Sequence, residues 1–131
     1  MTTRFDLVKH YLFDMGLPIT VENRAEELVV VDDEENGIKN LVIDCEDQIL
    51  ILEQVIMAVP ADDRALFKKL LQWNRELVHG AFTLDDAGNR VIFRDTLQLE
   101  NLDRNELEAS IQSLSLAMAE YSSELLKFAK A

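Results

Sequence analysis

Three segments of the chain carry apolar residues three or four positions apart, which is the spacing of a helix with one buried face. The first segment is residues 3–15, and Gly16 directly after it is typical of a helix end. The second runs from residue 62 to residue 80, and the third from residue 103 to residue 130. We therefore expect one helix near each end of the chain and one in its middle.

Between these segments, apolar residues alternate with polar ones or form short β-branched runs, as in strands. The dipeptide Asn36-Gly37 predicts a hairpin turn, and Ile19 and Val21 could begin a further short strand. The clear strands are expected at residues 28–31, 38–45, 49–59, 82–84 and 91–99. Residues 1–131 are therefore expected to form one α+β domain. It would have a single antiparallel sheet faced by helices, in the order α-β-β-β-α-β-β-α.

One carboxylate interrupts the alternation of the last strand. Asp95 falls on the side of that strand which otherwise carries apolar residues. Either a β-bulge or a local hydrogen-bond partner would explain its position. The sequence leaves both explanations open.

The segment at residues 49–59 is apolar on both faces of the expected strand. Pro60 ends it, because proline cannot donate a hydrogen bond to a neighbouring strand. A strand with two apolar faces lies either in the centre of its sheet or under a second subunit. Both interpretations stay open, and the central position is the simpler one.

The last helix is the most regular element of the sequence. Asp103 and Glu106 form a capping-box-like start, and the apolar residues then follow in steps of four and three. Such a helix either lies across the sheet as part of the core or extends past it to a partner. Together with residues 49–59 it supplies the expected partner or dimer surface, namely Ile49, Ile51, Val55, Met57, Leu114, Met118, Tyr121 and Leu125.

The formal net charge of the 131 residues is −12, which changes the range of expected partners. Nucleic acids and anionic membrane surfaces need clustered Lys and Arg, so we expect neither as a partner. The single cysteine, Cys45, cannot form an internal disulfide, and the N-terminus lacks the pattern of a signal peptide. The longest apolar run is too short to span a bilayer. A cytoplasmic protein is therefore expected.

Residues that could carry chemistry are sparse. The acidic turn at residues 32–37 imitates the start of an EF-hand loop, but its twelfth position is Ile43 instead of a bidentate Glu. Glu76 and His79 have the spacing of a di-metal ligand pair without the required second copy, so His79 is simply expected at a helix C-terminus. No glycine-rich phosphate loop is present. We therefore expect no catalytic residue, no metal and no cofactor, and the protein is not expected to be an enzyme.

Several motifs resemble a known group of proteins. They are Leu70-Leu71-x-x-Asn74, Gly80-Ala81-Phe82-x-Leu84-Asp85, Val91-x-Phe93-Arg94-x-x-Leu97-x-Leu99, and Leu102 with the terminal helix. On these motifs the chain is similar to the YbjN family and to the class I type III secretion chaperones of the Tir-chaperone (CesT) group. The resemblance covers residues 28–126. It implies a small, acidic, homodimeric cytoplasmic protein. The secretion chaperones hold an extended segment of a partner protein, whereas YbjN-like proteins are described as sensory or regulatory.

Two functional hypotheses follow. The first is a chaperone-like homodimer that takes a peptide or an unfolded segment by strand addition or in an apolar groove. The second is a small-ligand sensor, or an undetected enzyme, with a pocket between sheet and helices near Trp73, His79 and Cys45.

Overall fold

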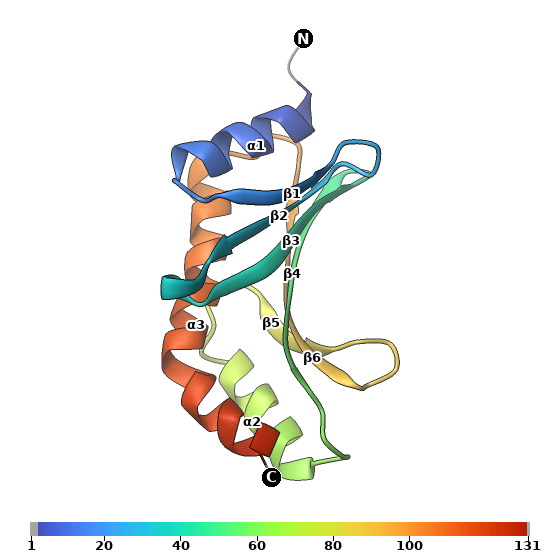
Figure 1. Ribbon diagram of the computed structural model, residues 1–131, viewed down its shortest axis with the longest axis vertical. Coiled ribbons are helices and arrows are strands. Elements are labelled where there is room, and N and C mark those ends of the chain that lie inside the picture. The colour runs from blue at the N-terminus through green and yellow to red at the C-terminus, as the bar shows by residue number, and fades with distance from the viewer. Residues whose placement is uncertain (1–2, 131) are drawn as a thin grey trace.

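The structure is a computed structural model that describes residues 3–130, and its centre is one antiparallel sheet of six strands. The strands lie in the order β1-β2-β3-β4-β6-β5, so that neighbours along the chain are mostly neighbours in the sheet (Figure 1). Their bounds are β1 Ile19–Asn23, β2 Leu28–Asp33, β3 Ile38–Glu46, β4 Ile49–Ala58, β5 Ala81–Leu84 and β6 Arg90–Gln98. Every pair of neighbours is antiparallel, which confirms the predicted α+β class.

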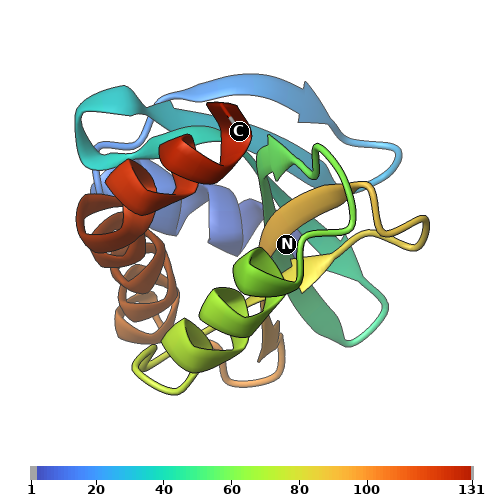
Figure 2. The same cartoon turned by 90° about the horizontal axis from the view of Figure 1, so that it is seen from below.

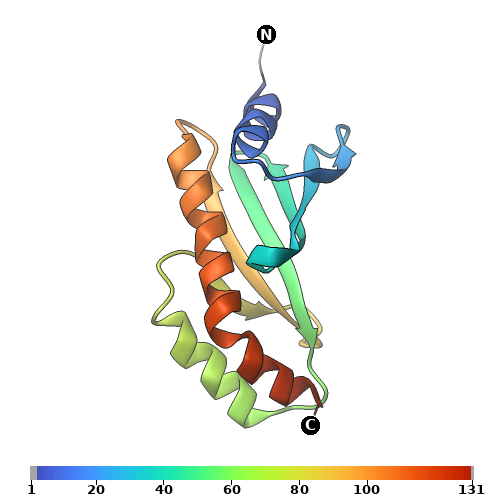
Figure 3. The same ribbon diagram turned by 60° about the vertical axis from the view of Figure 1, so that its left-hand side comes forward.

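Three α-helices pack on one face of this sheet. They are α1 Arg4–Asp14, α2 Arg64–Asn74 and α3 Arg104–Lys130, and a short 3-10 helix, η1 Glu34–Asn36, joins β2 to β3. Figure 2 shows the three α-helices gathered within the curve of the sheet, and Figure 3 shows α3 running along it. Within residues 3–130, no helix lies on the opposite face.

The core lies between the sheet and the helices. Alternate residues of the strands point into it, so that Leu50 and Leu52 of β4 are buried while Ile51 between them is half-buried. Trp73 of α2 stacks on Tyr121 of α3 with ring centroids 4.5 Å apart, which joins the two helices. Burial of aromatic rings contributes strongly to such a core.

The helix starts follow the predicted capping chemistry. The backbone N–H of Glu106 donates to the Asp103 carboxylate at 2.8 Å, and the N–H of Asp103 donates to the Glu106 carboxylate at 3.3 Å. This reciprocal pair is the capping box that the sequence predicted for α3. Asp63 caps α2 in the same way, by accepting from the N–H of Leu66 at 3.1 Å.

Two details differ from the predicted order of elements. Residues 19–23 form a complete edge strand, β1, so four strands precede α2 instead of three. The second helix ends at Asn74 and not at Gly80. The reason is that the Asn74 side chain binds the backbone of Phe82, which turns the chain back toward the sheet. His79 consequently lies in a loop and not at a helix C-terminus.

The odd position of Asp95 is explained by a partner. The hydroxyl of Ser110 in α3 donates to the Asp95 carboxylate at 2.6 Å, and the pairing of β6 with β4 is regular at this point. A hydrogen bond satisfies a polar group that faces the core. Of the two explanations left open by the sequence, the local partner is the correct one.

We expect Gly37→Ala to destabilise the protein more than Gly16→Ala. Both glycines have a positive φ, which costs an alanine about 1–2 kcal/mol. A methyl group at position 37 would also lie 2.6 Å from Cβ of Met118, whereas nothing lies within 4 Å at position 16. We expect the crowding at position 37 to add about 1–3 kcal/mol. Chemical denaturation measures both, and equal losses would contradict the close packing of α3 against this turn.

Candidate binding surface

The side of the sheet that faces away from the helices is a continuous, mostly apolar surface. We call it the outer sheet face. The strand register brings its residues together, since Val30 pairs with Val42 and Val55 pairs with Ile92. These side chains are half-buried or exposed, and Val55 is 55% exposed. The outer sheet face consists of Val30, Val42, Asp44, Ile51, Glu53, Val55, Ile92 and Arg94. An open apolar sheet face of this kind marks an interaction site.

An ion pair crosses the middle of the outer sheet face. The Arg94 guanidinium donates to the Glu53 carboxylate at 2.9 Å, and the two residues are direct partners in the pairing of β4 with β6. Both side chains remain more than one-third exposed. The pair therefore neutralises one carboxylate on this surface and adds little to stability.

One end of the outer sheet face is acidic. Burial raises the pKa of Asp44, and the negative charges of Glu46, Glu26 and Glu53 raise it further. Among the described residues, no Lys or Arg forms an ion pair with Asp44, Glu46 or Glu26. The outer sheet face is thus apolar over most of its area and carries, at one end, carboxylates that pair with no Lys or Arg of the described residues.

The β5 edge of the sheet is closed by a side chain. The amide of Asn74 accepts from the N–H of Phe82 at 2.7 Å and donates to the carbonyl oxygen of Phe82 at 3.1 Å. These are the two hydrogen bonds that a further strand would make to this residue. Asn74 therefore blocks the addition of another chain at β5.

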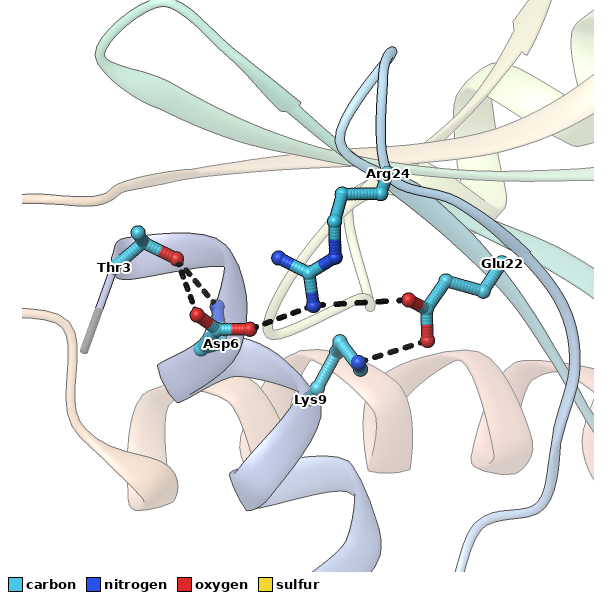
Figure 4. A network of polar contacts seen from close by, with 5 residues as sticks. All are labelled: Thr3, Asp6, Lys9, Glu22 and Arg24. Atoms are coloured by element: carbon cyan, nitrogen blue, oxygen red, sulfur yellow. Dashed lines mark hydrogen bonds and ion pairs between the residues drawn. The ribbon is translucent and has the colours of Figure 1, made fainter. Parts of the chain in front are cut away.

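The β1 edge is free. Among the described residues β1 pairs only with β2, and all of its residues except Ile19 are exposed. Charged side chains hold its inner side to α1: Lys9 lies 2.8 Å from Glu22, and Arg24 lies 2.9 Å from Asp6 (Figure 4). The hydrogen bond from Arg24 lowers the pKa of Asp6. This network positions β1 and leaves its outer edge unpaired.

A second exposed apolar site lies among the helices. The loop after α2 carries Val78, which is 84% exposed, and α3 carries Leu116, which is 69% exposed. Both line a groove of about 540 Å³. Ser113 holds the loop to α3, because its hydroxyl donates to the carbonyl oxygen of His79 at 2.6 Å and accepts from the His79 N–H at 3.3 Å.

The structure separates the residues that the sequence placed at a partner or dimer surface. Ile49, Ile51 and Val55 lie on the outer side of β4, which is a central strand between β3 and β6. Met57 and Met118 are half-buried against the core. The remaining three residues are buried within the chain, because α3 lies across the sheet; they are Leu114, Tyr121 and Leu125. For these three the expectation of a partner contact is corrected.

The structure does not bring Trp73, His79 and Cys45 together in the expected pocket. Trp73 packs beside β5, whereas Cys45 lies on β3, and two strands separate β3 from β5. Burial raises the pKa of the Cys45 thiol to about 11, so that it is protonated at neutral pH and is a poor nucleophile. Within residues 3–130, no three His, Cys, Asp or Glu side chains are arranged to hold a metal ion.

Sequence reasoning missed the free edge at β1 and the closing role of Asn74. The polar composition of residues 19–27 hid the strand, although Ile19 and Val21 were a partial signal.

No helix in the described part of the chain is long and apolar enough to cross a membrane.

Comparison with known proteins decides the family. The sequence model of the CesT_Tir_1 family matches residues 1–131. The chain belongs to the CesT_Tir_1 family. A comparison with curated proteins finds no match. Membership therefore rests on the family model, and it agrees with the resemblance that the sequence motifs indicated.

Solved structures show how widely this CesT_Tir_1 fold is shared. YbjN from E. coli, a proposed transcription regulator, has a TM-score of 0.72 at 15% identity, and the match covers 95% of each chain. The heterodimeric ExoU–SpcU complex of the Pseudomonas aeruginosa type III secretion system has a TM-score of 0.69 at 20% identity, covering 93% of this chain and 97% of that chain. The HopA1–SchA chaperone–effector complex has a TM-score of 0.64 at 11% identity, covering 86% and 88%. Likeness at these identities establishes the shared fold.

We expect Asn74→Ala to destabilise the protein and to loosen the β5 edge. The substitution removes both hydrogen bonds to Phe82, which costs about 1–3 kcal/mol in total. Gln72→Ala is the matched control, because Gln72 is exposed on the same helix. Hydrogen exchange at the Phe82 amide should accelerate in the first variant only. An unchanged exchange rate would show that Asn74 does not close this edge.

Proposed function

We propose that the protein is a non-enzymatic, chaperone-like module of the cytoplasm that binds an extended segment of a partner protein. The observation that carries this proposal is a sheet with one uncovered apolar face and one free edge, at β1. Membership in the CesT_Tir_1 family and the shared fold with a chaperone–effector complex support it.

Strand addition is the binding mode that suits this geometry. The unpaired main-chain groups of β1 can hydrogen-bond to an extended segment, because every other strand edge in the described sheet is paired or closed. Alternate side chains of the added strand would then point to the outer side of the sheet, next to Val21 and Val30. Main-chain bonds would supply affinity there, and the apolar contacts would supply selectivity.

We also propose that the protein is a homodimer, joined through its helical layer. Val78 and Leu116 are the apolar residues exposed at the groove beside α3, and small residues such as Ala109 and Ala119 line the same groove. Small side chains permit close approach of two helices. A seam at this place leaves the outer sheet face and the β1 edge free for the partner segment.

A photo-crosslinking experiment tests the binding function. A photoreactive residue replaces Val21 on β1 in one variant and Phe13 on α1 in the other, since both side chains are more than half exposed. In cells that make the protein naturally, we expect position 21 to capture one continuous stretch of a partner protein. Position 13, outside the proposed surface, should capture none. Equal capture at both positions, or none at position 21, would contradict the proposal.

Light scattering tests the dimer. The wild-type protein should have twice the 15.0 kDa mass of one chain at micromolar concentration. Leu116→Glu should give the monomer, because a two-fold seam would bury two like charges against each other. Phe13→Glu is the matched control, since Phe13 is equally apolar and 79% exposed, and it should remain dimeric. A monomeric wild-type protein would refute the dimer and leave the crosslinking result intact.

A further inference from the structure

We infer that the segment held on the outer sheet face is cationic, and that the side chains it turns toward the sheet include both Lys or Arg and apolar residues. This inference rests on the proposed function and names the chemistry of the partner. It combines the apolar floor of the surface with the unpaired carboxylates at its end.

The carboxylates lie on β3, about 14 Å from a strand added beside β1, so the part of the segment that crosses the outer sheet face is the part that reaches them. Asp44 pairs with Ile51 across β3 and β4, and it pairs with Leu28 across β2 and β3. It is therefore flanked by apolar side chains on the same face of the sheet. Glu46, two residues further along β3, lies on the same side and is exposed. A cationic side chain of a segment that passes over Val30 or Val42 would contact these carboxylates.

The unbound protein leaves this acidic end electrostatically unsatisfied. Asp44 is partly removed from water and is surrounded by three further carboxylates, and both effects raise its pKa. A bound Lys or Arg would offset both effects, because an opposite charge favours the carboxylate form. Charge complementarity of this kind improves the rate and the selectivity of association more than its affinity.

Among the described residues, no Lys or Arg forms an ion pair with Asp44 or Glu46 at the acidic end of the outer sheet face. Arg94 is bonded to Glu53, and Lys39 and Arg90 lie toward the opposite end of the strands. A second copy on this face would bring another net charge of −12 toward the same carboxylates. A cationic segment of a different protein therefore fits this face better than a second copy does.

The apolar part of the segment also has a place to bind. A hollow of about 680 Å³ lies on the outer sheet face between β3 and β6, and Val42, Val55 and Ile92 line it. Adjacent side chains of an extended segment that point the same way are separated by about 7 Å. A segment with a cationic residue and an apolar residue two positions apart can thus present the first to the carboxylates and the second to this hollow.

Three labelled peptides of equal length test the inference by fluorescence anisotropy. In the first, lysine and valine occupy every second position in turn, with serine between them, so that both face the same side. In the second and third, glutamate and serine replace the lysine. We expect the lysine peptide to bind most tightly. The double variant Asp44→Asn/Glu46→Gln should weaken that binding about five- to tenfold, which corresponds to the loss of one or two modest ion pairs.

A matched double variant separates a local site from general attraction. Asp62→Asn/Asp86→Asn changes the net charge equally at two exposed positions outside the outer sheet face and outside the groove beside α3, and it should change affinity by less than about twofold. Equal weakening by both double variants would overturn the inference, because it would show attraction by net charge alone. So would a serine peptide that binds as tightly as the lysine peptide, or no binding of any peptide.

Charge reversal and a mass measurement complete the test. The double variant Asp44→Lys/Glu46→Lys should bind the glutamate peptide more tightly than the lysine peptide. If this variant fails to fold, Asp44→Asn/Glu46→Gln still provides the test. Val55→Lys should weaken the lysine peptide without changing the mass of the protein; conversion of a dimer to a monomer would place a second copy on this face and overturn the inference. An acidic partner segment captured at position 21 would likewise overturn it while leaving the proposed function standing.

Discussion

The structure depends on the burial of α3 against one face of the sheet. Leu107, Leu114 and Leu125 lie fully within the core along the length of this helix. The same helix also holds α2, the loop after α2 and β6 in place. It stacks Tyr121 on Trp73 of α2, binds Asp95 of β6 through Ser110, and fixes the loop after α2 through Ser113. Apolar burial supplies most of the stability, and these hydrogen bonds define the geometry.

Because all three helices occupy one face, the other face has no cover. An antiparallel sheet can leave one face to solvent, but that face usually carries polar residues. Here the open face carries Val30, Val42, Ile51, Val55 and Ile92, with the Glu53–Arg94 ion pair and Asp44 among them. The two edges of the sheet differ in the same way, since Asn74 closes β5 while β1 stays unpaired. The asymmetry confines strand addition to one edge of the described sheet and leaves one face of the sheet open to apolar contact.

The distribution of charge makes one end of the outer sheet face more acidic than the other. Acidic residues outnumber basic ones by 25 to 13 in the chain, and the carboxylates around Asp44 lie at one end of the outer sheet face. On most of the surface a carboxylate is solvated at little cost. At Asp44 it is partly buried among like charges, which makes this end of the sheet the place where a cation changes the electrostatic energy most.

The sequence by itself determined the class of fold and most of its elements. Periodicity of 3.6 and of 2 located all three helices and five strands, and the Asp103–Glu106 pair marked the start of α3 correctly. Both kinds of signal are local, since they depend on residues within a few positions of each other. Only the tertiary structure decided which apolar residues remain exposed: Leu114, Tyr121 and Leu125 face the sheet, whereas Ile51 and Val55 do not face the helices. It also decided that Asn74 ends α2 and closes an edge, and that Ser110 satisfies Asp95. These contacts join residues that are distant in the chain or belong to different elements, so no local pattern could specify them.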